Sequence, residues 1–179
     1  TLSLPAVAAA TPEGHEIVIE DERVKKIHLD DDPDLVGVSF EVFRAYRAYE
    51  IADHYRQRHV PVVLGGMHAS VMPEEGLEHA DAVVVGEADE VWPQVVTDAE
   101  AGQMQGIYKG GDPVDLAKLK PPRLDLLDAS RYFPLYPIEA TRGCTHACSF
   151  CTTRYVHGLE FRTRPVDHVI ADLDRAGNR

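Results

Sequence analysis

PVVLGG, at residues 61–66, is a short aliphatic run that ends in two glycines. Two similar runs lie before and after it, LVGVSF at residues 35–40 and DAVVVGE at residues 81–87. Uninterrupted apolar runs of this length are typical of strands that are buried on both faces of a parallel sheet. We therefore predict three such strands, and a fourth from EIVIED at residues 16–21.

Helical patterns separate these runs. PEEGLEHA at 73–80 predicts a short helix that opens at a proline, and EADEVWPQVVTDAEAG at 87–102 predicts another that ends at Gly102. The alternation predicts an α/β fold, with a Rossmann-like (flavodoxin-like) parallel sheet domain over residues 1–110 that is covered on both faces. A longer crossover helix is predicted within residues 41–59, where apolar residues recur at helical spacing, namely Val42, Ala45, Tyr46, Tyr49 and Ala52.

The composition changes after residue 110. Prolines without a regular period predict a Pro-rich linker over residues 111–135. A second unit over residues 136–179 then begins with a strand in YPIEATRGC at 136–144 and ends with a helix in RPVDHVIADLDRAG at 164–177. One strand, loop and helix cannot bury an apolar face alone, and the helical pattern in LPAVAAATPEG at 4–14 has no strand before it. We therefore expect a piece of a longer protein, truncated at both ends and missing the first strand of its sheet.

The chain carries a formal net charge of −12 over 179 residues. Such acidity argues against nucleic-acid binding, which depends on Lys and Arg that neutralise phosphates. No stretch approaches the ~20 apolar residues of a transmembrane helix, and the first residues lack the basic segment of a secretory signal. The three cysteines all fall within residues 144–151, unlike the even-numbered disulfide framework of a secreted domain. These features predict a cytoplasmic protein with no transmembrane segment.

The cysteines stand in GCTHACSFC at residues 143–151, as Cys144, Cys148 and Cys151. Three thiolates at this spacing, on a loop that leaves a strand, can hold three corners of a 4Fe-4S cluster and leave its fourth iron open for chemistry. Two alternatives remain at this point. A zinc ion could be closed by a Cys3His set that uses His146 or His157, or two cysteines could form a disulfide and leave one thiol spare.

The loop GCTHACSFC resembles the cluster motif of the radical S-adenosylmethionine enzymes, in which an aromatic residue commonly precedes the third cysteine, as Phe150 does here. The resemblance implies that Cys144, Cys148 and Cys151 hold the cluster and that Phe150 lies near the adenine of S-adenosylmethionine. It also implies reductive cleavage of that cofactor to a 5'-deoxyadenosyl radical, with an electron donor such as flavodoxin or ferredoxin.

The first domain resembles the cobalamin-binding domain that precedes the radical domain in one subfamily, through DLVGVSF, PVVLGGMHASVMPEE, DAVVVGEADEVWPQVV and RYFPLYPIEATRGC. Ligands of open parallel sheets bind at the carboxyl ends of the strands. Each residue there also has a plainer explanation, as a turn glycine, a helix cap, a loop histidine or a first-turn acid. The sequence has no Asp-x-His-x-x-Gly, the motif whose histidine ligates cobalt in another cobalamin-binding group. The implied cobalamin contacts are Ser39, Gly65, Gly66, His68, Gly86 and Glu87.

Together these resemblances imply a cobalamin-dependent radical S-adenosylmethionine enzyme. We expect methyl transfer to, or rearrangement of, an unactivated carbon of a small or hydrophobic natural product, and we assign no catalytic residue. Two alternatives are a methylthiolating radical enzyme and a non-catalytic Rossmann-like module with a zinc-bound tail. Because a barrel active site needs several strands, this piece alone is expected to be inactive.

Overall fold

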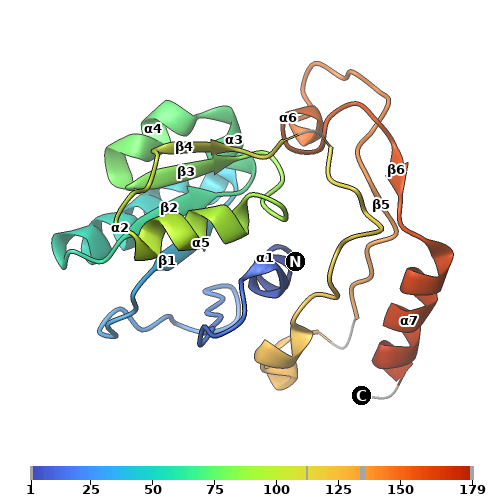
Figure 1. The fold of residues 1–179 in the computed structure, drawn as a ribbon, viewed down its shortest axis with the longest axis horizontal. Coiled ribbons are helices and arrows are strands. Elements are labelled where there is room, and N and C mark those ends of the chain that lie inside the picture. Colours follow the sequence, from blue (N-terminus) through green and yellow to red (C-terminus); the bar gives the residue numbers. More distant parts are fainter. Residues whose placement is uncertain (1, 112, 134–135, 178–179) are drawn as a thin grey trace.

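The computed structural model describes residues 2–111, 113–133 and 136–177. Its main sheet has four parallel strands in the order β1-β2-β3-β4 (Figure 1). These are β1 (Val36–Ser39), β2 (Val62–Gly65), β3 (Ala82–Val85) and β4 (Ile107–Lys109). The predicted α/β fold is confirmed, and the strands expected at 35–40, 61–66 and 81–87 are β1, β2 and β3.

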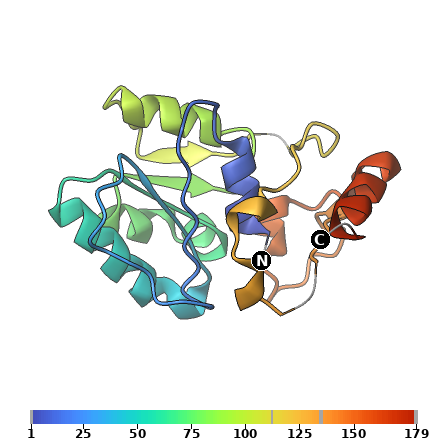
Figure 2. The same cartoon turned by 90° about the horizontal axis from the view of Figure 1, so that it is seen from below.

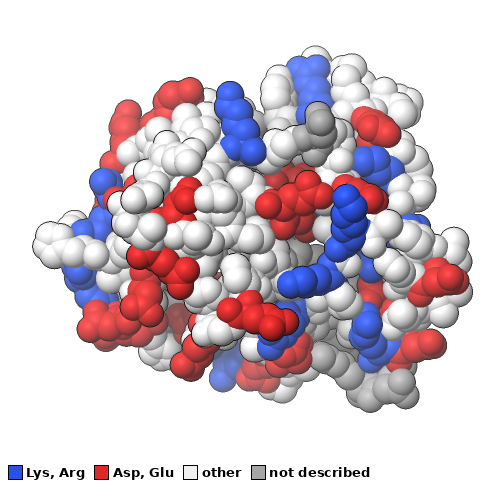
Figure 3. All heavy atoms as spheres, viewed as in Figure 1, with Lys and Arg blue, Asp and Glu red and all other residues white. Residues whose placement is uncertain are grey.

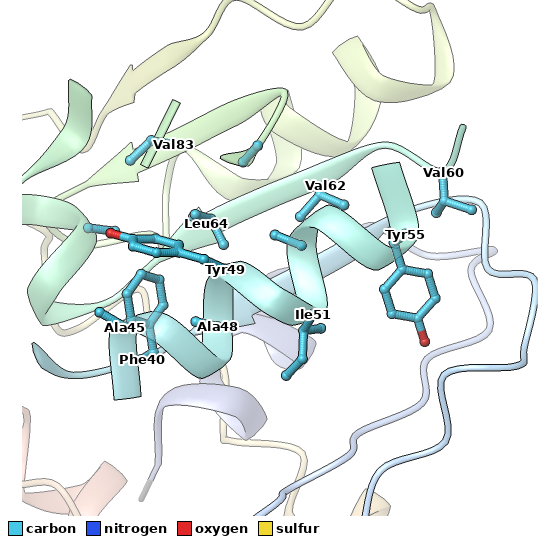
Figure 4. Close-up of a cluster of buried hydrophobic side chains, with 13 residues drawn as sticks. Phe40, Ala45, Ala48, Tyr49, Ile51, Tyr55, Val60, Val62, Leu64 and Val83 are labelled. Atoms are coloured by element: carbon cyan, nitrogen blue, oxygen red, sulfur yellow. The ribbon is translucent and has the colours of Figure 1, made fainter. Parts of the chain in front are cut away.

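One face of the sheet is covered by α2 (Ala45–Gln57) and α4 (Pro73–His79). A 3-10 turn, η1 (Val42–Arg44), leads into α2, and α3 (Met67–Val71) leads into α4. Figure 4 shows the core of this face, in which Leu64 of β2 and Tyr49 of α2 lie in one cluster with Phe40. The rings of Phe40 and Tyr49 meet edge to face, with centroids 5.6 Å apart.

The opposite face is covered by α5 (Trp92–Glu100), and Figure 2 shows α5 and α2 on opposite sides of the sheet. Helix α1 (Ser3–Ala10) packs against the same cluster through Val7 and Ala10. Val95 of α5 packs in one cluster with Val63 and Val84, the strand residues whose side chains point away from α2. Gly37 of β1 admits the Trp92 ring, because a Cβ at this glycine would lie 3.0 Å from a ring carbon. The expected cover on both faces is therefore present.

The prediction of a strand at residues 16–21 is wrong. Residues 15–21 have no regular secondary structure, and β1 is the first strand among the described residues. A β-branched run forms a strand only when a neighbouring strand pairs with it, and this run has no such partner in the described part of the chain. Side chains tie the segment down instead, since Tyr132 donates a hydrogen bond to Asp21 at 3.0 Å and Arg47 pairs with Glu22 at 2.7 Å.

Four short helices and strands were not expected from the sequence: β4, α3, α6 (Thr153–His157) and β6 (Arg162–Thr163). None of the four exceeds five residues, which is too short for a hydrophobic period to be read.

The segment predicted as a linker packs against the sheet domain. Val114 and Leu116 are 3% and 2% exposed, and the backbone N–H of Arg123 donates to the Pro5 carbonyl at 3.0 Å. Two 3-10 turns, η2 (Leu124–Leu126) and η3 (Ala129–Arg131), interrupt the segment. Residues 112, 134 and 135 of the predicted linker lie outside the described residues.

The last segment forms a small unit of its own. The expected strand at 136–144 is reduced to β5 (Thr141–Arg142), which pairs antiparallel with β6 (Arg162–Thr163). The cysteine loop and α6 lie between these two strands, and α7 (Val166–Gly177) follows as expected. A buried ion pair at 2.8 Å between Arg164 and Asp172 fixes α7 to the strands.

Candidate functional site

The loops after β1, β2 and β3 meet at the carboxyl edge of the sheet. Ser39 and Gly65 are register partners at the ends of β1 and β2. Gly66 has a φ of +92°, and a Cβ there would lie 2.8 Å from the Phe40 carbonyl oxygen. A side chain at this position would therefore be strained and would also collide with the neighbouring loop. Gly86 likewise has a positive φ, of +86°.

Ser70 joins two of these loops, although no motif in the sequence singles it out. Its hydroxyl donates to the Gly66 carbonyl at 2.8 Å and accepts from the Gly86 N–H at 3.0 Å. The side chain comes from α3 and is buried. Ser70 thus fixes the spacing of the glycines at the ends of β2 and β3.

His68 lies inside the core of the α2 face. Its ring packs against Phe40 and Tyr49, with centroid distances of 5.6 Å and 6.4 Å. The side chain is 12% exposed, and Nε2 lies 3.5 Å from a carboxylate oxygen of Glu75. Nε2 is buried and has no hydrogen-bond partner among the described residues, and the role of His68 as a cobalamin contact stays a prediction.

Glu87 follows β3 and is occupied by the last segment of the chain. Its carboxylate accepts from His157 Nδ1 at 2.7 Å and from both Nη atoms of Arg162 at 2.8 and 2.9 Å. Burial raises the pKa of Glu87, but hydrogen bonds from His157 and Arg162, with the charges of Arg142 and Arg162, lower it to about 2. The group is therefore an anion that is already fully paired.

Asp89 and Arg142 extend this network. Arg142 donates to Asp89 at 2.6 and 3.2 Å, and its Nε donates to Glu139 at 3.0 Å. The Arg142 side chain is buried, and Asp89 has a partner 53 residues away in the sequence. Helix α5 begins only at Trp92 and has no acid in its first turn, so Glu87 and Asp89 do not act as helix-start acids and are held by long-range ion pairs instead. The sequence does carry a signal for these ion pairs, since arginines flank the cysteine loop on both sides.

The cysteine loop runs from β5 to α6. All three thiols are free, with Cys148 exposed and Cys144 and Cys151 half-buried. The Cys151 N–H donates to the Cys148 carbonyl at 3.2 Å, which forms a turn between them. Hydrogen bonds from the Thr153 side chain and backbone lower the pKa of the Cys151 thiol. A lowered pKa favours the thiolate, which is the form that binds metal.

The structure does not gather the three thiols at one point. Within the described ranges, no group of three or more His, Cys, Asp or Glu is arranged to hold a metal ion. The donor set still suits an iron-sulfur cluster, because its three thiols share one surface loop. His146 is exposed, and His157 bonds Glu87 through Nδ1. Phe150, beside Cys151, is 88% exposed.

The cysteine loop and the sheet edge are neighbours. Helix α6, which follows the loop, lies against α3 beside the end of the sheet (Figure 1). A Cβ on Gly86 would lie 3.6 Å from the Val156 carbonyl oxygen of α6. The two groups of candidate residues therefore lie on one side of the molecule, and the prediction that they contact cofactors stays a prediction.

The surface has mixed charge on the visible face and a hollow away from the carboxyl edge. Figure 3 shows Lys and Arg as separate groups among Asp and Glu on the visible face, without an extended basic patch there. A hollow of about 930 Å³ lies at the opposite end of the sheet, lined by residues that include Pro61, Asp81 and Met104. No helix of the described residues combines the length and apolar character needed to cross a membrane.

A parallel sheet covered on both faces, with glycine loops at its carboxyl edge, defines a Rossmann-like ligand-binding domain. The model of the B12 binding domain family matches residues 1–96. The chain belongs to this family, and its first domain is a cobalamin-binding domain.

Several curated proteins resemble nearly the whole chain. The bacteriochlorophyllide d C-8(2)-methyltransferase of Chlorobaculum tepidum is 38% identical, over 91% of this chain and 38% of its own length. The C-12(1)-methyltransferase of the same organism is 32% identical, over 96% of this chain and 39% of its own length. The hopanoid C-2 methylase of Rhodopseudomonas palustris is 26% identical, over 96% of this chain and 33% of its own length. The chain thus spans less than half of each relative.

A solved structure shares the fold. The radical S-adenosylmethionine methyltransferase TsrM from Kitasatospora setae, with tryptophan substrate and a cofactor analogue bound, superimposes with a TM-score of 0.62. It is 20% identical and covers 82% of this chain and 35% of its own length. The shared fold therefore extends beyond the cobalamin-binding domain.

Proposed function

We propose that this chain is part of a cobalamin-dependent radical S-adenosylmethionine methyltransferase. The observation that carries the proposal is the contact of α6, which follows the three cysteines, with α3, which follows the glycine pair of β2. Methyl transfer requires the carrier and the acceptor in one cavity, so a cobalamin edge and a cluster loop have to be neighbours. The likeness to bacteriochlorophyllide methyltransferases supports the reaction class.

Cobalamin would lie on the carboxyl edge at Ser39, Gly65, Gly66 and Gly86. The glycines leave this edge without side chains, so a large flat ligand can approach the backbone. Ser70 keeps the loops at a fixed spacing through its two hydrogen bonds. Bound cobalamin supplies a carrier for the methyl group. Glu87 is already paired within the chain, so the proposed contacts come from the glycine loops, Ser39 and His68, whose Nε2 has no hydrogen-bond partner among the described residues.

Cys144, Cys148 and Cys151 would hold a 4Fe-4S cluster, which supplies an electron for the reductive cleavage of S-adenosylmethionine. Thr153 would favour the thiolate of Cys151 through its hydrogen bonds. Phe150 is exposed beside this ligand, where its ring can cover the adenine of S-adenosylmethionine. Electrons would come from a flavodoxin or ferredoxin, and the free thiols suit the reducing cytoplasm.

We further propose a small, hydrophobic natural product as the substrate. The relatives named for bacteriochlorophyllide d and for hopanoids support this class. Large apolar side chains are exposed around the cysteine loop, among them Tyr155 and Phe161 at 51% and 55%. An apolar surface beside the cofactors would bind such a substrate and exclude water.

Two titrations test the proposal. Hydroxocobalamin added to the purified chain is expected to change its visible spectrum to saturation at one equivalent. Anaerobic reconstitution is expected to load about four irons per chain with the visible absorbance of a 4Fe-4S cluster. Cys148→Ala should lower the iron content, while Thr145→Ala, an exposed change in the same loop, should not. A folded chain that binds neither cobalamin nor iron would contradict the proposal.

A further inference from the structure

Glu87 stands where three separate segments of the chain meet. It follows β3 at the end of the sheet, and its carboxylate also accepts from the Val114 N–H at 3.2 Å. His157 and Arg162, from the far side of the cysteine loop, occupy the rest of the carboxylate. Arg142, from the near side of the loop, lies 3.6 Å from it. One buried carboxylate therefore touches both ends of the cysteine loop.

We propose that Glu87 is a positioning residue that clamps the base of the cysteine loop onto the carboxyl edge of the sheet. The base consists of Arg142 before the loop and of His157 and Arg162 after it. This role differs from the cobalamin contact that the sequence suggested. The functional meaning of the clamp rests on the proposed function, since its effect is to hold the cluster loop beside the cobalamin edge. The contacts themselves do not depend on either cofactor.

The base of the loop is built to receive this carboxylate. Arg162 donates to Glu87 and also to the carbonyls of His157 at 3.0 Å and Val114 at 2.7 Å. Arg162 thus connects β6 to the end of α6 and to the segment at Val114. At the other end, a Cβ on Gly143 would lie 1.9 Å from the Glu160 carbonyl oxygen, so the backbones cross with no room for a side chain.

The saturation of the carboxylate argues against a ligand role. Its two oxygens accept from His157, from both Nη atoms of Arg162 and from Val114, and a carboxylate has about four lone-pair sites. A ligand could bind there only by displacing one of these donors. Removing a partner from a buried, hydrogen-bonded ion pair is costly, because the other charge is left buried and unpaired.

Hydrogen exchange on the 179-residue chain separates the two roles. Glu87→Gln keeps the size of the side chain but removes its charge, and Glu90→Gln is the matched control, an exposed glutamate three residues later. With Glu87→Gln, amides of α6 and β6 should exchange faster by about tenfold, because the loop opens locally. Amides of β2 and β3 should keep their protection. Glu90→Gln should change neither set.

A second variant covers the case in which Glu87→Gln does not fold. Arg162→Gln removes the partner and leaves Glu87 in place, and it should raise exchange in α6 and β6 in the same way while hydroxocobalamin titrates as in the wild type. In the double variant the two effects should be less than additive, because both changes break the shared contact between Glu87 and Arg162. A rise that is additive would overturn the clamp.

The cobalamin titration distinguishes the clamp from a direct contact between Glu87 and cobalamin. If Glu87→Gln weakens hydroxocobalamin binding while exchange in α6 and β6 stays at the wild-type rate, Glu87 is a ligand contact and the clamp is wrong. If the wild-type chain binds no cobalamin, the proposed function fails. The exchange result still decides the clamp in that case, because it needs no cofactor.

Discussion

The hydroxyl oxygen of Ser70 accepts a hydrogen bond from the backbone N–H of Gly86, at 3.0 Å. This bond connects helix α3 to the loop after β3. Since Ser70 also donates to the Gly66 carbonyl, one buried hydroxyl sets the distance between the two glycine loops of the proposed cobalamin edge. The edge is therefore ordered before any ligand arrives, which lowers the entropic cost of binding.

Ser70→Ala should destabilise the chain by about 1–3 kcal/mol, because it leaves the Gly86 N–H without its partner in a buried site. Urea unfolding followed by circular dichroism measures this change. Thr97→Ala is a matched control, since the Thr97 hydroxyl also donates to the carbonyl four residues earlier but is exposed. The Thr97 change should cost less than about 0.5 kcal/mol. Equal losses for the two variants would contradict the linking role of Ser70.

Gly66→Ala should disrupt the edge more severely than Gly102→Ala. Both glycines have positive φ, +92° and +65°, so both changes strain the backbone by about 1–2 kcal/mol. A Cβ at Gly102 meets open space, whereas one at Gly66 meets the Phe40 backbone at 2.8 and 2.9 Å. Thermal unfolding should separate the variants, and hydroxocobalamin binding should be lost only in Gly66→Ala. Similar melting temperatures would show that the close approach at Gly66 relaxes freely.

Acid should destabilise the chain through Glu87. The pKa of this group falls from 4.5 to about 2 in the folded chain, so its contribution to stability is present above pH 4.5 and is lost as the pH falls toward 2. A shift of this size corresponds to about 3 kcal/mol. The free energy of unfolding, measured by urea titration between pH 6 and pH 3, should therefore fall less steeply in Glu87→Gln than in the wild type. Parallel curves would contradict the assignment.

The sequence predicted the parts of the fold that depend on local patterns. The runs around Val63 and Val83 are buried on both faces of a sheet, so their apolar composition alone identified β2 and β3. The run at residues 16–21 also has a β-branched centre, Ile17 to Ile19, but acids flank it. Pairing decides whether such a run becomes a strand, and pairing is not a local property.

The candidate site also combines residues that local patterns predict with residues that long-range contacts place. Gly65 and Gly66 follow directly from their place at the end of a strand, and the cysteine spacing is a local motif. Arg162, which pairs with Glu87, lies 75 residues away in the sequence, and no short pattern predicts this pair. His68 was grouped with the glycines because it follows them closely, but the first turn of α3 directs its ring between Phe40 and Tyr49. Side-chain direction within a helix decided its position.

The outer face of α7 should make the isolated chain associate. Val166, Ile170 and Leu173 are 71%, 49% and 54% exposed, and they recur at the spacing of one helix face. Apolar side chains that form a continuous exposed stripe favour contact with a second apolar surface, since contact removes that area from water. Sedimentation velocity should therefore detect oligomers whose fraction rises with protein concentration. Ile170→Lys places a charge at the centre of the stripe and should shift the population to monomer, whereas His168→Lys, at an exposed position on another face of the same helix, should leave association in place. An equal effect of the two changes would point to net charge, rather than the apolar stripe, as the cause of association.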